Sequence, residues 1–329
     1  MYYLLGASLA FAALFAVNLL SSLTATAYWL CARRGAHRWS ARARARLVFA
    51  LRFIPLVVSV LVTFTLVVPA YVVHEPPASG EVPSIKLAVV ALLSACGICF
   101  SAWRAVASWR ATRRLTSLWM RQGVPVGVAG NSIPAYRIAH PFPLVAVVGA
   151  FKPRLFIANQ VFETLDEDEI AAAVAHETAH VAAHDNLKRT LLNFCRDVML
   201  TIPCARTLDD AWSVESEAAA DERAASAGAF SALTLAGALV KIARMAPAGM
   251  KPFMPVGSYI AGDAGCVERR VRLLTRIASS GSSNSPERLI APRFLKVSLA
   301  GTLGAFLFAA ALPDVLATAH ALLEFFVRL

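Results

Sequence analysis

The stretch AHETAHVAAHD, residues 175–185, carries the residues best suited to chemistry. His176 and His180 stand four residues apart, and Glu177 directly follows the first of them. On a helix, residues four apart project from one face, so both imidazoles can bind one zinc ion. Glu177 would then lie beside the metal and take a proton from zinc-activated water. The alternative interpretation is a helix whose polar histidines face solvent.

A catalytic zinc site needs a third protein ligand and one open position. His184 lies one turn further on, but each four-residue step drifts by about 40° around a helix. We therefore expect it at the rim or beside a ligand. Glu217, in WSVESEAAADERAA, is the better candidate, and Asp221, one turn beyond, can accept the second N–H of a ligating histidine. Surface charge is the alternative interpretation of both acids.

Composition indicates a membrane protein. Hydrophobic residues make up 57% of the 329 residues, compared with about 45–50% in soluble domains. A helix crosses the hydrocarbon with about 20 apolar residues, so the uncharged runs predict four spans. A cleavable signal peptide is the alternative for the first run, which is too long for one and lacks its basic start. The uncharged runs are 1–32, 53–73, 87–103 and 297–313.

The charges of the loops orient the chain. Residues 32–46 hold six arginines, whereas 74–84 hold two glutamates and neither lysine nor arginine. Because basic short loops stay in the cytoplasm, we expect both termini outside the inner membrane and the long middle region in the cytoplasm. Basic loops beside anionic lipid also explain the net charge of +11. We expect a lipid bilayer as partner and no nucleic acid.

These features predict a multi-span α-helical membrane protein with a cytoplasmic α+β domain. Residues 1–115 would hold three transmembrane helices, at about 2–31, 48–73 and 87–104, with the basic loop 32–47. Residues 116–290 would form the zinc domain, and 291–329 a fourth transmembrane helix with a short external tail. Within the middle region, β-rich runs in 124–158 predict three or four strands, and Thr164 or Asp166 would cap the helix that carries the histidines.

Four further helices are expected in the middle region after the histidine helix. They cover about 187–200, 209–227, 231–245 and 266–277. Glu215 and Glu222 fall on other faces of their helix than Glu217, so we expect their side chains to be solvated.

The motif pair HETAHVAAHDNLKRTL and ESEAAADERAA resembles the membrane gluzincins. It is most similar to the bacterial antirepressor metallopeptidases related to the β-lactam sensor–transducers. The upstream stretch VVGAFKPRLFIANQVFETLDEDEIAAAVAHE and the order of the spans resemble the same family. The heat-shock and CAAX prenyl-protein proteases share HExxH and ExxxD. The resemblance implies a zincin-like (gluzincin) domain with one zinc ion per chain on His176, His180 and Glu217, and with Glu177 as general base.

The resemblance also implies residues that support the site. Three of them would contact ligands or the rim rather than the ion, namely Asp221, His184 and Asp185. In gluzincins an edge strand above the active-site helix holds the substrate as an added strand. Here that strand would be 144–151, with Val145, Val147 and Gly149 as its substrate-binding residues.

Arg270 lies where related sequences carry an arginine near the site, so the resemblance suggests it as the donor to the oxyanion. The alternative is an ordinary arginine on a helix surface.

The first interpretation of the function is a zinc metalloendopeptidase that cleaves a protein or peptide at the cytoplasmic membrane face, with a repressor or other regulator as substrate. Quality-control cleavage of membrane proteins and a non-catalytic signalling scaffold are the alternatives. The chain ends sixteen residues beyond Pro313, without the external penicillin-binding domain of the sensor–transducers. We therefore expect any signal to enter through residues 74–86, the tail, the membrane or a separate sensor or regulatory protein.

Overall fold

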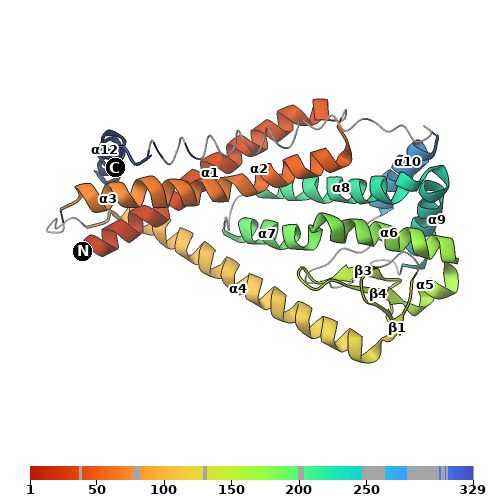
Figure 1. The fold of residues 1–329 in the computed structure, drawn as a ribbon. Coiled ribbons are helices and arrows are strands. Elements are labelled where there is room, and N and C mark those ends of the chain that lie inside the picture. The colour runs from red at the N-terminus through yellow and green to blue at the C-terminus, as the bar shows by residue number, and fades with distance from the viewer. Residues whose placement is uncertain are drawn as a thin grey trace.

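The structure is a computed structural model, and it describes residues 1–36, 39–76, 82–128, 132–198, 204–246, 264–279, 304, 308 and 310–328. Long helices form one end of the molecule, and a small sheet with shorter helices forms the other (Figure 1). The middle region is α+β, as the sequence predicts: a four-stranded sheet with helices packed against it.

Three helices are long and apolar enough to cross a membrane among the described residues. The first is α1 (Tyr2–Ala36), and the third is α4 (Ile85–Gln122). The second consists of α2 (Ala41–Val62), the π-helical turn η1 (Thr63–Val67) and α3 (Val68–His74). Pro69 follows this turn and lacks the N–H that a regular helix would use there, which accounts for the wider turn.

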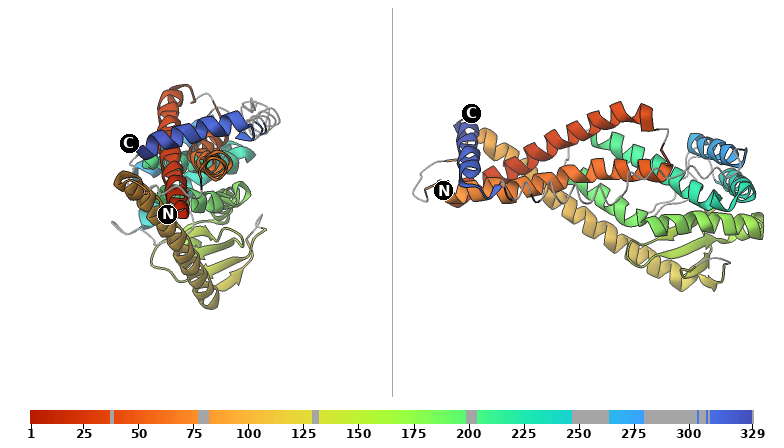
Figure 2. Two further views of the ribbon diagram at one scale, coloured as in Figure 1. Left: turned by 90° about the vertical axis from the view of Figure 1, so that its left-hand side faces the viewer. Right: turned by 45° about the horizontal axis from the view of Figure 1, so that its top comes forward.

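The predicted fourth span lies almost entirely outside the described residues. Helix α12 (Pro313–Arg328) follows it and packs against α3 and η1. It runs across the end of the long helices where the N-terminus also lies (Figure 2). The predicted tail is therefore helical.

The sheet has the order β1-β2-β4-β3, with β1 (Val124–Val126), β2 (Ala135–Ile138), β3 (Val145–Val148) and β4 (Arg154–Ala158). Strands β2 and β4 are parallel and the other pairs are antiparallel. Helix α4 runs unbroken through residue 116, the predicted boundary of the domain, and leads directly into β1. Its Trp119 packs edge-on against Phe156 of β4, with 5.1 Å between the ring centroids.

The remaining helices pack against the sheet, against one another or against the long helices, and they build the site. They are α5 (Asn159–Thr164), α6 (Glu167–Ala183), α7 (Asp185–Val198), α8 (Cys204–Ala224) with the 3-10 turn η2 (Ala225–Ala227), α9 (Ala229–Met245) and α10 (Ala264–Ser279). Helix α6 packs against β3, α8 and α9, while α8 also packs against α1 and α2. Strand β3 stands at the edge of the sheet, alongside α6.

Candidate metal centre

Helix α6 places both histidines of the HExxH motif on one buried face. Asp166 caps the helix and forms a capping box with Glu169, so the first turn of α6 is fixed by two side-chain bonds. His176 and His180 are buried, and their Nε2 atoms lie 3.2 Å apart. The interpretation of these histidines as solvent-facing is therefore wrong.

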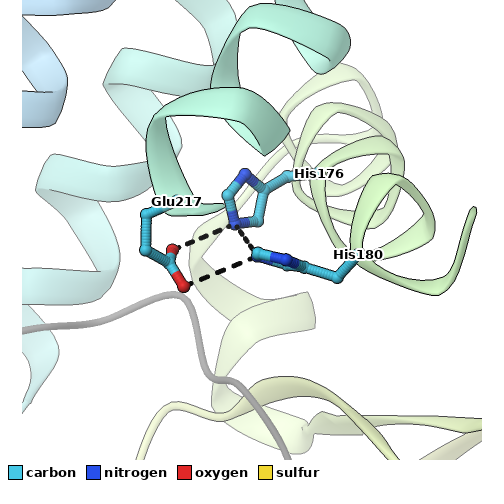
Figure 3. Close-up of side chains that lie close together, drawn as sticks. All are labelled: His176, His180 and Glu217. Carbon is cyan, nitrogen blue, oxygen red and sulfur yellow. Dashed lines mark hydrogen bonds and ion pairs between the residues drawn. The ribbon is translucent and has the colours of Figure 1, made fainter. Parts of the chain in front are cut away.

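Helix α8 brings Glu217 to the same point from the opposite side (Figure 3). Its Oε2 lies 3.5 Å from His176 Nε2, and its Oε1 lies 3.5 Å from His180 Nε2. Two ligands about 2.1 Å from a tetrahedral zinc ion are about 3.4 Å apart. The three side chains could thus hold one metal ion, and their donor set and spacing fit zinc.

Each histidine is oriented by a carboxylate at its other nitrogen. His176 Nδ1 lies 3.0 Å from Asp221 Oδ1, and His180 Nδ1 lies 2.8 Å from Asp185 Oδ2. A carboxylate at Nδ1 selects the tautomer that leaves Nε2 free to bind a metal. The sequence predicts Asp221 beside a ligating histidine. In the structure Asp221, on α8, contacts His176 of α6.

His184 ends helix α6 in the left-handed conformation, with φ of 57°. This is uncommon for a residue with a side chain. The sharp turn sends the next two residues, Asp185 and Asn186, back toward the site, where both are buried. The His184 side chain is exposed and lies outside the group of three donors.

Arg270 is a buried residue, only 5% exposed, so its interpretation as a helix-surface arginine is wrong. Its Nε and Nη2 atoms donate to the two oxygens of Asp221 at 2.8 and 2.7 Å, and its Nη1 lies 3.2 Å from Glu217 Oε2. The guanidinium therefore fixes both carboxylates that α8 contributes. Its role as an oxyanion donor stays a hypothesis, and the contacts favour a positioning role.

Glu177 is buried between α6 and the edge strand. Its Oε2 accepts a hydrogen bond of 3.1 Å from the N–H of Val147, and its Oε1 has no hydrogen-bond partner among the described residues. Burial raises the pKa of Glu177, although His176 and His180 act in the opposite direction. A carboxylate with a raised pKa and one open oxygen is suited to accept and later release a proton.

The pKa values of His180 and Glu217 indicate that a metal ion would replace a proton when it binds. Burial disfavours the charged form of His180, but the carboxylates of Glu217 and Asp185 outweigh this effect and raise its pKa to about 10. Burial also opposes ionisation of Glu217, yet His180, His176 and Arg270 bring its pKa well below the ordinary value. The metal-free site therefore holds an ionised glutamate and a proton on His180.

The edge strand β3 directs alternate main-chain groups away from the sheet. Leu144 accepts a bond from the Ala158 N–H, so in an antiparallel ladder the groups of Val145, Val147 and Gly149 point to the free edge. The Asn186 side-chain amide donates to the carbonyls of Val147 and Gly149 at 3.0 and 3.1 Å. Sequence reasoning missed Asn186, and only its place after the HD pair could have drawn attention to it.

The far side of α8 is bound to the second long helix. Glu215 Oε2 accepts from Arg44 Nε at 2.7 Å, and both oxygens of Glu222 accept from the N–H of Ala41, at 3.2 and 3.0 Å. Asp209 Oδ1 accepts from Arg52 Nε at 3.0 Å. The expectation that Glu215 and Glu222 are solvated is wrong, because the start of α2 covers them.

The model of Peptidase family M48, a family of zinc metallopeptidases, matches residues 136–250. The match runs from β2 to the end of α9 and includes His176, Glu177, His180, Glu217 and Asp221. It indicates a metallopeptidase, a hydrolase, joined in this chain to three helices that could span a membrane. A comparison with curated proteins gave no match.

Proposed function

We propose that the chain is a zinc-dependent membrane endopeptidase that cleaves a peptide bond of a protein substrate at the cytoplasmic membrane face. The observation that carries this proposal is the convergence of His176, His180 and Glu217, with the buried, unpaired carboxylate oxygen of Glu177 on the residue next to His176. The family match supports the reaction class. The arginines of 32–46, next to α1 and α2, support the cytoplasmic side.

Zinc, held by His176, His180 and Glu217, would supply Lewis-acid activation of water and of the scissile carbonyl. Glu177 accepts the proton of the attacking water at Oε1 and later passes it to the leaving amine. The N–H of Val147 keeps Oε2 turned toward the strand, and Oε1 has no hydrogen-bond partner among the described residues. Asp221, Asp185 and Arg270 hold the ligands in place before substrate arrives.

The substrate would run beside β3 as an added strand, so that main-chain hydrogen bonds align it with the site. Val145, Val147 and Gly149 supply the groups on that edge, and a substrate would replace the bonds that Asn186 makes to the carbonyls of Val147 and Gly149. For the identity of the substrate, a repressor or other regulator follows from the resemblance to the antirepressor peptidases. The position of Glu177 argues against a non-catalytic scaffold, which would have no use for a buried carboxylate with an open oxygen.

The proposal is tested by comparing protein N-termini in cells that carry the wild-type chain and cells that carry Glu177→Gln. We expect new N-termini only with the wild type, and these identify the substrate. Glu163→Gln is a matched control, because that side chain is 69% exposed on α5, and it should behave as the wild type. The same comparison is made with the three purified proteins and added membrane proteins. Equal N-termini for all three variants, in cells that receive the activating signal or with the purified proteins, would overturn the proposal.

A further inference from the structure

A cavity of about 130 Å³ opens beside the candidate metal centre. One wall is the turn after β3, from Gly149 to Pro153, and the other is the end of α6, with His180, Val181 and His184. The turn is fixed by Gly149, whose φ is +102° and whose added Cβ would lie 2.8 Å from the Lys152 carbonyl. The backbone of this turn therefore fixes one wall of the cavity, and the end of helix α6 forms the other.

The size of the cavity suits one amino-acid side chain. An apolar cavity of about 150 Å³ in another protein holds benzene, whereas pockets for drug-sized ligands start near 300 Å³. A leucine, methionine or phenylalanine side chain matches 130 Å³. Its described lining contains no carboxylate, lysine or arginine, and its polar side chains are those of His180, His184 and Asn186. Val181, Ala150 and Phe151 give it apolar walls.

The position of the cavity ties it to the proposed reaction. His180 both lines it and contributes to the group of three metal donors. Gly149, at its other wall, continues the free edge of β3, where Val147 touches the proposed general base. A peptide laid along this edge with its scissile bond at the metal centre therefore brings the neighbouring side chain to the cavity mouth.

We propose that this cavity receives the substrate side chain next to the scissile bond, on the Gly149 side, and selects uncharged side chains of leucine to phenylalanine size. This inference rests on the proposed peptidase function. Val181 is the residue to vary, because its side chain lines the cavity from α6 and also packs against the core around the sheet.

The test is a cleavage-site profile of the full-length protein in detergent with zinc, acting on a peptide mixture from a digested proteome. We expect the wild type to enrich leucine, methionine and phenylalanine at one position beside the cleaved bond. Val181→Ala should shift that position toward larger aromatic residues, and Val181→Phe toward alanine and serine. Each shift should be about tenfold or more, since one methylene in an apolar pocket changes selection by about 10–200-fold.

One control variant, a second filling variant and a binding measurement keep the test decisive. Leu233→Ala alters an exposed side chain on α9 and should leave the profile unchanged. Ala150→Leu fills the cavity from the opposite wall and replaces Val181→Phe if that variant folds poorly. On the Glu177→Gln background, the best-cleaved wild-type peptide, fluorescently labelled, should bind at least about tenfold more weakly when the cavity is filled.

The outcomes separate the two claims. Cleavage with the same profile in the wild type, Val181→Ala and both filling variants overturns the cavity assignment and leaves the peptidase standing. If the wild type and Glu177→Gln leave the same peptides uncleaved, the peptidase proposal fails, and the cavity assignment fails with it.

Discussion

Helices α6 and α8 each supply part of the metal centre, but different parts of the molecule hold them. Helix α6 packs against the edge strand and α9, and its Ala173 and Val174 belong to the core around the sheet. Helix α8 packs against α1 and α2, and its Leu208 and Trp212 share a cluster with Trp29 of α1. One half of the site thus belongs to the peptidase core and the other to the long helices.

This difference shows in the polar contacts of the two helices. Outside the metal centre, α6 is held by its own capping box of Asp166 and Glu169, by Val147 of β3 and by Lys241 of α9, which donates to Glu169. Outside the metal centre, α8 is held by partners on α2, such as Arg44, which lies 171 residues from Glu215. The distance between the two histidines and Glu217 is therefore set by how the long helices sit against the core.

The largest effect is expected from Glu177→Gln on α6. Loss of the general base should lower the turnover number by about 10²–10⁴-fold, while the protein keeps one zinc ion, because the three donors are unchanged. Turnover is measured on a cleaved peptide, and zinc by elemental analysis. Activity within threefold of the wild type at full zinc content would contradict the role of Glu177.

The next effect compares the two orienting carboxylates, Asp185 at the start of α7 and Asp221 on α8. Asp185→Asn and Asp221→Asn should weaken zinc binding by about 10–100-fold. Asp221→Asn should be the worse of the two, since it also leaves the buried Arg270 with less negative charge. Competition with a zinc chelator measures both affinities. Equal losses of zinc affinity in the two variants would show that the contact between Arg270 and Asp221 does not contribute to zinc binding.

A smaller effect is expected from Arg52→Leu, which touches no site residue. Arg52 is buried and holds Asp209 at the start of α8, so its loss should change zinc affinity through the position of α8. Coupling of this kind is about 0.5–2 kcal/mol, or roughly 2- to 30-fold. Arg272→Leu, which breaks an exposed pair on α10, is the control and should have no effect. An unchanged zinc affinity in Arg52→Leu would contradict the claim that α2 positions α8 for metal binding.

The smallest change to the protein is a single proton, which needs no substitution. With its pKa raised to about 10, His180 is protonated in the metal-free protein at pH 7.5 and must lose that proton to bind zinc. Zinc affinity should therefore rise by about tenfold per pH unit between pH 6.5 and 8.5, with about one proton released per ion. Calorimetry in buffers of different ionisation enthalpy measures this release. A pH-independent affinity would show that His180 is already neutral.

The sequence was informative wherever a signal is local. The period of the strands, the capping residues before α6 and the four-residue spacing of the histidines predicted these elements and the buried ligand pair. The ExxxD spacing predicted that Glu217 and Asp221 share a face. These signals need only the residues of one helix or strand.

The sequence could not reveal contacts made between distant segments. Glu215 and Glu222 looked like solvated charges because nothing near them indicates that the start of α2 covers them. The resemblance suggested Arg270 as a site residue, but the residues alone left a helix-surface arginine open, because its two partners lie on another helix. Asn186 gave no signal because it binds main-chain carbonyls, which carry no sequence pattern.

Helix α7 connects the site to the apolar part of α4. It starts at Asp185, and its last residue, Val198, approaches Gly97 so closely that a Cβ there would lie 2.5 Å from the Val198 carbonyl oxygen. Fourteen helical residues span about 21 Å. An extended peptide covers that distance in about six residues. A substrate anchored in the bilayer at the depth of Gly97 would thus need a tether of only about six residues to present its cleavage site.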